Sequence, residues 1–152
     1  MPHLDVVQEM RSPVPIFEEE FYHDGRGPEL QRVIWGYRGQ ILRGFEYYNP
    51  DDEYTPENLR HLEIEKVEAY SMAGEEVHNR IAANGNSKAA ILRIADSEWK
   101  STFQQNHLQD CEHFQIMFYD EIFDVICRRI IPGKGPLTKN QEAQQDAPSN
   151  GG

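Results

Sequence analysis

The stretch from residue 112 to residue 130 constrains the fold more than any other part of the chain. It reads EHFQIMFYDEIFDVICRRI, and apolar or aromatic side chains alternate on both sides of Asp120-Glu121. This pattern predicts two β-strands joined by a tight turn, with residue 119 paired with residue 122. The dry face then consists of three cross-strand pairs: Phe114 with Cys127, Ile116 with Val125, and Phe118 with Phe123. The opposite face is mixed and carries His113, Gln115, Met117, Tyr119, Asp124 and Arg128.

Four further strands and a second turn are visible upstream. A hairpin is predicted over 31–48, because runs of aromatic and β-branched residues flank a glycine-containing turn at 37–40. A strand with one wet face is predicted over 60–69, where Leu and Ile alternate with charged residues. The apolar run at 89–95 predicts a buried strand.

Two segments instead favour helices. Over 71–83, apolar residues recur every four positions, which is the period of a helix face. Ser97 is suited to cap a second short helix over 98–108. The predicted order is therefore β-β-β-α-β-α-β-β. This order indicates an α+β fold, a mainly antiparallel sheet with two short helices on one face.

The two ends of the chain differ from its middle. Residues 1–28 contain four prolines and few large apolar side chains, and we expect them to form an irregular N-terminal arm. Residues 132–152 contain Leu137 as their only large apolar residue, so this tail cannot bury enough surface to offset the entropy of ordering it. We therefore expect a single compact domain over 29–131 and a disordered polar tail after it.

The net charge limits the classes of partner. The formal charge is −11 at pH 7, which disfavours anionic lipid surfaces and direct binding to nucleic acid. The first ten residues lack the basic start and apolar run of a signal peptide, and no window approaches the roughly 20 apolar residues that span a bilayer. These features predict a cytoplasmic protein. No motif for a cofactor is present, and none is expected.

The acidic residues are concentrated in one half of the chain. Residues 1–76 carry 17 acidic and 7 basic side chains, whereas residues 77–152 carry 9 and 8. One interpretation is solubility alone. The other is an acidic, aromatic-bearing surface that attracts a basic protein partner. The residues expected on that surface are Glu18, Glu19, Glu20, Tyr47, Tyr48, Asp51, Asp52, Glu53 and Tyr54.

Cysteine and histidine supply a second group of candidates. Cys111 and Cys127 should face opposite sides of the hairpin, so both thiols are expected to be free. His107, Cys111 and His113 have nitrogen and sulfur ligands for zinc, although a closed site needs four ligands and Arg128 is expected opposite His113. Cys111 and His113 can also be interpreted as a nucleophile and its base. The simpler interpretation is an inert thiol beside an ordinary histidine.

Two functions from different classes follow from these patterns. The favoured hypothesis is a non-catalytic binding protein that presents its acidic surface to a basic partner, with the general character of an immunity protein, an inhibitor or an antitoxin. The alternative is a small enzyme or a ligand- or metal-binding domain. It uses the face around Cys111, His113, Asp124 and Arg128. Self-association through an exposed strand edge is compatible with either hypothesis.

Overall fold

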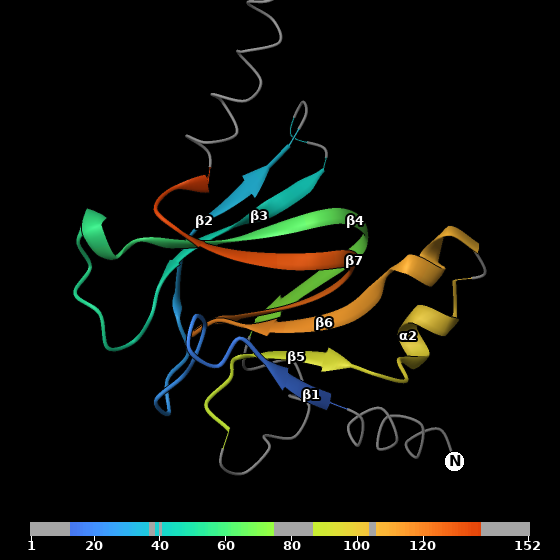
Figure 1. The fold of residues 1–152 in the computed structure, drawn as a ribbon, viewed down its shortest axis with the longest axis horizontal. Helices are drawn as coiled ribbons and strands as arrows, with labels where there is room; N and C mark the ends of the chain where they lie inside the picture. Colours follow the sequence, from blue (N-terminus) through green and yellow to red (C-terminus); the bar gives the residue numbers. More distant parts are fainter. Residues whose placement is uncertain (1–12, 37–38, 40, 75–86, 104–105, 138–152) are drawn as a thin grey trace, which may run out of the picture.

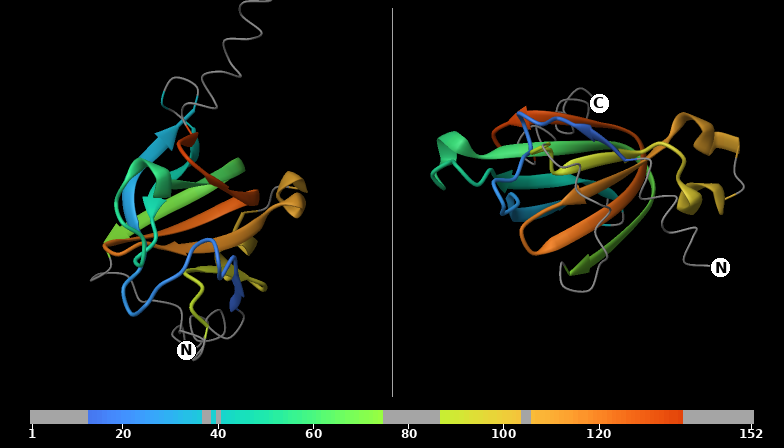
Figure 2. Two further views of the ribbon diagram at one scale, coloured as in Figure 1. Left: turned by 60° about the vertical axis from the view of Figure 1, so that its left-hand side comes forward. Right: turned by 90° about the horizontal axis from the view of Figure 1, so that it is seen from below.

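The chain forms one strongly twisted antiparallel sheet with few helices (Figures 1 and 2). The structure is a computed structural model, which describes residues 13–36, 39, 41–74, 87–103 and 106–137, apart from the side chain of His107. The seven strands are β1 (Pro13–Ile16), β2 (Glu29–Trp35), β3 (Leu42–Tyr48), β4 (Arg60–Gly74), β5 (Ile91–Ile94), β6 (Glu112–Met117) and β7 (Glu121–Lys134). The short helices are η2 (Pro56–Asn58), α2 (Glu98–Ser101) and η3 (Asn106–Asp110).

The strand order is β1-β5-β6-β7-β4-β3-β2, and each of the six pairings between these strands is antiparallel. The two longest strands, β4 and β7, therefore lie side by side at the centre. β1 lies at one edge and contains Pro13 and Pro15. Proline has no N–H to donate to a second neighbour, so an edge position suits this segment. The coarse prediction of a mainly antiparallel sheet is confirmed.

The main core lies on one face of the sheet. It combines side chains from β3 to β7 with aromatic residues of the connecting loops. Phe118 is central to it, since its ring lies 5.2 Å from the rings of both Phe21 and Phe45 and 5.9 Å from that of Phe123. Edge-to-face aromatic contacts of this kind add to the free energy gained by burying the rings. Residues far apart in sequence are thus held in one cluster.

The β6–β7 hairpin has the predicted faces but not the predicted register. All six residues expected on the dry face belong to the main core. The observed pairs, however, are Phe114 with Val125 and Ile116 with Phe123, a shift of two residues. The cause is a turn that lies one residue earlier, on Tyr119-Asp120: Phe118 N donates to Glu121 O, and Tyr119 N donates to Pro28 O. A shift by an even number keeps each side chain on its face, because side chains in a strand alternate with period two.

The first predicted helix does not begin where the period indicated. Residues 71–74 are the last residues of β4 and pair with β7, and residues 75–83 lie outside the described part of the chain. The second predicted helix is shorter than expected. It is the four-residue α2, whose N-cap Ser97 accepts a hydrogen bond from Lys100 N, as the sequence indicated.

The compact unit extends beyond residues 29–131 on both sides. Within the expected arm, β1 pairs with β5 and Phe21 lies fully inside the core. At the other side, β7 continues to Lys134 and Leu137 is buried against β3, where Leu137 N donates to Glu46 Oε2 at 3.0 Å. Residues 1–12 and 138–152 lie outside the described residues.

Within the described residues, no helix combines the length and the apolar character needed to cross a bilayer.

Candidate functional site

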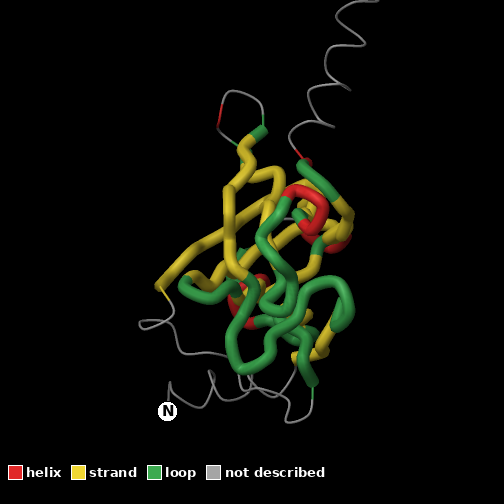
Figure 3. The backbone as a smooth tube through the Cα atoms, turned by 90° about the vertical axis from the view of Figure 1, so that its left-hand side faces the viewer, coloured by secondary structure: helices red, strands yellow, loops and turns green. Residues whose placement is uncertain are grey.

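Three loops from distant parts of the sequence meet at one end of the sheet. These are residues 17–28, residues 49–58 and the turn between β6 and β7, which lie on the left in Figure 1 and toward the viewer in Figure 3. The Glu20 carbonyl joins the first two loops, because it accepts hydrogen bonds from Tyr47 Oη at 2.7 Å and from Asn49 Nδ2 at 3.0 Å. The Pro28 carbonyl joins the third, through Tyr119 N at 2.7 Å.

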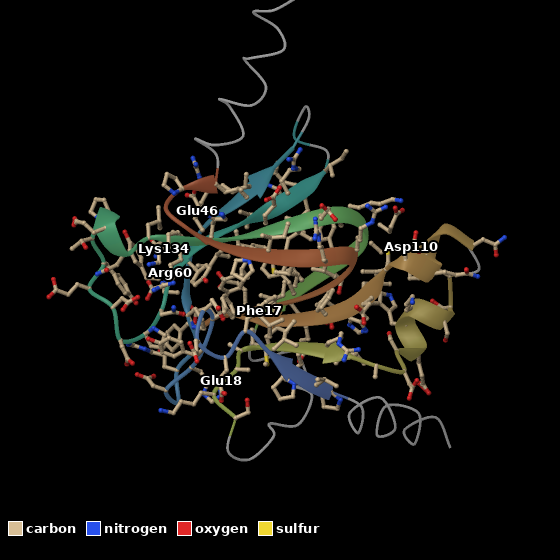
Figure 4. The ribbon with its side chains drawn as sticks, in the orientation of Figure 1. Phe17, Glu18, Glu46, Arg60, Asp110 and Lys134 are labelled. Atoms are coloured by element: carbon tan, nitrogen blue, oxygen red, sulfur yellow. The ribbon has the colours of Figure 1, made fainter. Side chains whose placement is uncertain are left out.

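This arrangement gathers exposed acidic side chains that are separate in the sequence. We call the region the acidic end and define it by the exposed carboxylates of Glu18, Glu19, Glu20, Asp24, Glu29, Asp51, Glu53 and Asp120 together with Tyr54 and Tyr119. Figure 4 labels Glu18 and Arg60 on this side of the molecule and Asp110 on the other. The two acidic stretches predicted to share a surface, 18–20 and 51–53, are therefore adjacent in space.

The three tyrosines predicted for this surface differ in exposure. Tyr47 was expected on the surface, but its exposed fraction is 0% and its ring lies 4.8 Å from that of Phe21. It is therefore a core residue, and its hydroxyl fastens a loop. Tyr48 is half-buried and stacks on Tyr54, with ring centroids 4.7 Å apart, and Tyr54 keeps 47% of its surface exposed.

Several of the predicted carboxylates also stabilise the loops that carry them. Glu18 Oε2 accepts a hydrogen bond from Lys88 N at 2.8 Å. Asp51 Oδ2 accepts one from the Tyr22 hydroxyl at 3.3 Å. Asp52 is half-buried and lies 3.8 Å from Arg60 Nε. The acidic end is thus a set of internally braced loops, with Glu19 and Glu53 exposed at its surface.

Sequence reasoning missed the contribution of the β6–β7 turn and of the start of β2. Tyr119 is 46% exposed, and the guanidinium carbon of Arg26 lies 5.7 Å from the centre of its ring. Glu29 Oε1 accepts a hydrogen bond from the Tyr54 hydroxyl at 2.9 Å. The residues Tyr119-Asp120-Glu121 were visible as an acidic turn, but only the register places them beside Pro28 and Glu29.

The pKa values of three groups in this region are raised, first by burial and then by nearby carboxylates. Burial, the carboxylate charges of Asp51 and Asp52, and the hydrogen bond to Asp51 raise the pKa of Tyr22. Burial and the hydrogen bond to Glu29 raise the pKa of Tyr54. Burial, together with the charge of the adjacent Asp120 and of Glu29, also raises the pKa of Glu121. The tyrosine hydroxyls therefore stay protonated and donate hydrogen bonds to the side chains of Asp51 and Glu29.

The opposite end of the sheet holds a hydrogen-bonded group of three polar side chains that no sequence motif predicted. Ser97 Oγ lies 2.6 Å from His113 Nδ1, and His113 Nε2 lies 2.7 Å from Asp124 Oδ1. We call these three residues the Ser97 relay. His113 is only 3% exposed, and Trp99 covers it at a ring distance of 5.1 Å. Gln115 Nε2 lies 3.4 Å from the same Asp124 oxygen.

The relay corrects the expected surroundings of His113. Arg128 was expected opposite His113, but the observed partner across the hairpin is Ile126, and Arg128 is exposed. Asp124 pairs with Gln115, two residues further along β6, and from there its carboxylate reaches the imidazole. His113 and Asp124 therefore belong together, as the alternative hypothesis required, whereas Arg128 does not join them.

Cys111 is placed for packing and not for nucleophilic attack. Its exposed fraction is 0%, and it packs in a small cluster with Leu108 and Ile126. Burial and the neighbouring charge of Glu68 raise the pKa of its thiol, which lowers the fraction of reactive thiolate. Cys127 lies in the main core, and both thiols are free, as predicted.

The zinc hypothesis finds no support in the residues that can be placed. The side chain of His107 lies outside the described residues. Both ring nitrogens of His113 already have hydrogen-bond partners, so neither is directed at a metal. Among the residues described, no group of three or more His, Cys, Asp and Glu side chains is arranged to hold a metal ion.

The Ser97 relay opens onto a surface hollow of about 270 Å³. The lining combines polar and apolar side chains: Ser97, Lys100, Ser101, Phe103, Leu108 and Gln109, with Ala95 at its rim. Within this described lining, Lys100 is the one residue that carries a charge. Ser97 thus connects a buried histidine and carboxylate to the solvent side of α2.

No protein-family model, curated protein or solved structure matches this chain. Any assignment of function therefore depends on the chemistry of its own residues.

Proposed function

We propose that the acidic end of this protein is a non-catalytic binding surface that receives a basic segment of another protein. The observation that carries the proposal is the convergence of three loops, which brings exposed carboxylates and tyrosines to one end of the sheet. Carboxylates steer and orient a basic partner, and exposed aromatic side chains supply the contact area that stabilises the complex.

The chemistry of this end favours arginine over lysine in the partner. Arg26 already places its guanidinium over the Tyr119 ring, which shows that this ring is accessible to a cation. The stacked pair of Tyr48 and Tyr54 offers a second flat surface bordered by Glu29 and Glu53. A guanidinium can stack on such a ring and bind a carboxylate at the same time.

The general character resembles that of small acidic immunity proteins, inhibitors and antitoxins, in composition only. Repulsion between phosphates and a chain of charge −11 argues against nucleic acid and anionic membranes as partners. A cytoplasmic location remains part of the proposal and is supported by the two free thiols. Self-association along an edge strand such as β2 also remains a prediction.

The test is capture of a partner from host lysate with two variants of equal charge. Glu19→Lys with Glu53→Lys changes exposed positions of the acidic end, whereas Asp96→Lys with Asp110→Lys changes exposed positions outside it. We expect a basic protein to be retained at about 50 mM salt, by the wild type and by the second variant only, and to be depleted at about 500 mM salt.

Loss of the captured protein in both variants would show that net charge alone causes retention, and would contradict a defined binding surface. Retention by both variants would contradict it as well.

A further inference from the structure

We propose that the Ser97 relay is a nucleophilic site for short-chain esters, with Ser97 as nucleophile, His113 as general base and Asp124 as positioning residue. The two hydrogen bonds of the relay, at 2.6 Å and 2.7 Å, join the three groups in the order that this chemistry requires. A nucleophile must lie within hydrogen-bond reach of its base, and a third group must orient that base. The relay shares no residue with the acidic end, so this inference does not depend on the proposed binding function.

In the proposed site, each proton of the relay has a hydrogen-bond acceptor. Lys100 N donates to Ser97 Oγ at 3.0 Å, so the serine hydroxyl is free to donate its own proton to His113 Nδ1. In the proposed site His113 Nδ1 accepts this proton, and the ring proton lies on Nε2, where it is donated to the Asp124 carboxylate. The lone pair of Nδ1 is then directed at the serine hydroxyl, which is the arrangement needed for a general base.

All three residues of the relay are largely covered, and Ser97 is the one that borders a surface hollow. His113 and Asp124 have side-chain exposures of 3% and 14%, and Ser97, which is 8% exposed, lines the 270 Å³ hollow. Phe103 of that hollow also lines a neighbouring hollow of about 330 Å³ with Trp99 and Ile41, which provides an apolar wall for an acyl chain. Lys100 contributes a positive charge, which stabilises negative charge that develops on a reacting carbonyl oxygen.

The reaction proceeds in two balanced steps. Ser97 Oγ bonds to the carbonyl carbon of the ester, the hydroxyl proton passes to His113 Nδ1, and the carbon–oxygen bond to the leaving alcohol breaks as that alcohol takes the proton. Water then attacks the acyl-serine in the same way, giving the free acid and restoring the Ser97 hydroxyl. Between proton transfers the imidazolium lies beside the Asp124 carboxylate, which stabilises its charge.

A second serine in the same hollow, Ser101, can be compared with Ser97. Ser101 also lines the hollow, but its hydroxyl donates to the Glu98 carbonyl at 2.7 Å. It is the more exposed of the two serines. Exposure alone would therefore favour reaction at Ser101, and activation by histidine would favour reaction at Ser97.

The first experiment treats the full chain with a fluorophosphonate, which phosphonylates activated serines, and locates the adduct by peptide mass spectrometry. We expect one adduct, on Ser97, with Ser101 unlabelled. Absence of an adduct would overturn the proposal, and so would equal labelling of Ser97, Ser101 and other exposed serines.

The second experiment measures hydrolysis of p-nitrophenyl acetate and p-nitrophenyl butyrate. Ser97→Ala should abolish turnover, and Asp124→Asn should lower kcat by roughly a hundredfold or more with little change in KM, since it changes the orientation of the base and not the hollow. Circular dichroism and thermal unfolding confirm that each variant is folded. Turnover that persists in folded Ser97→Ala would exclude Ser97 as the nucleophile.

Discussion

The acidic end and the end that holds the Ser97 relay place their polar groups in opposite ways. At the acidic end many carboxylates are exposed, and the braces that hold its loops include backbone carbonyls such as that of Glu20. In the relay, two hydrogen bonds join three side chains, two of which are buried and the third largely covered. Removing one exposed charge therefore changes stability little, whereas removing one member of a buried hydrogen-bonded group leaves its partner unsatisfied and lowers stability.

The largest effect on stability should come from the aromatic residue that fastens the acidic end to the core. Phe21→Ala removes a fully buried ring that contacts Tyr47 and Phe118, and we expect a loss of about 3–5 kcal/mol in the free energy of unfolding. Phe103→Ala, at a partly exposed phenylalanine next to α2, is the matched control and should cost much less. Urea denaturation compares the two, and equal losses would mean that Phe21 is not the fastening residue.

The next largest effect should come from the Ser97 relay. Asp124→Ala leaves the His113 Nε2–H without its acceptor in a buried position, which should cost about 1–3 kcal/mol. Asp120→Ala, at an exposed position in the turn of the same hairpin, should change stability by no more than about 0.5 kcal/mol. Thermal unfolding of both variants tests the contrast. If Asp124→Ala does not change the free energy of unfolding, the two ends do not differ in their sensitivity to the loss of a carboxylate.

A smaller effect is expected from the hydroxyl that fastens the loop at the acidic end. Tyr47→Phe keeps the buried ring and removes the 2.7 Å hydrogen bond to the Glu20 carbonyl, so the expected loss is about 0.5–1.5 kcal/mol. Tyr48→Phe serves as the control, because Tyr48 is half-buried and stacks on Tyr54 through its ring. Chemical denaturation should separate the two variants.

The smallest effect should be a gain in stability that depends on pH. The pKa of Glu121 is raised, mainly by burial and then by Asp120, so its ionised form destabilises the folded state above that pKa. Glu121→Gln removes this penalty, and we expect a gain of no more than about 0.5 kcal/mol at pH 7, the usual range for a change near the surface. The gain should vanish as the pH falls below the ordinary glutamate pKa, where Glu121 is protonated in both states. A gain that persisted at low pH would contradict this origin.

The sheet was largely predictable because its strands alternate clearly. The two faces of β6 and β7 follow from the period-two pattern, and the β2–β3 hairpin follows from aromatic and β-branched runs on both sides of a turn. The register shift did not follow, since it depends on a tertiary hydrogen bond between Tyr119 N and Pro28 O. The end of β4 was also missed. Lys66 has a positive φ of 59°, and a bulge follows between Val67 and Ala69, so the alternation is interrupted there and only a helix-like spacing is visible.

For the candidate sites too, the exposed residues were easier to predict than the buried ones. Charge and composition were enough to select the acidic stretches, because exposed residues need only be near one another. They placed Tyr47 on the surface although it is buried, since a tyrosine that packs and a tyrosine that binds have the same sequence signal. The Ser97 relay needed both the register and the return of the chain from β5 through α2, neither of which is encoded in local spacing.

The two free cysteines allow local opening to be measured separately on each side of the sheet. Cys127 is in the main core, and Cys111 lies in the small cluster with Leu108 and Ile126, against which Trp99 of α2 packs. A buried thiol reacts with an alkylating reagent only when its surroundings open, so its rate reports the free energy of that local opening. Under native conditions, the alkylation rate of Cys127 therefore reports local opening of the main core. The alkylation rate of Cys111 reports local opening of the cluster against which Trp99 packs, next to the relay.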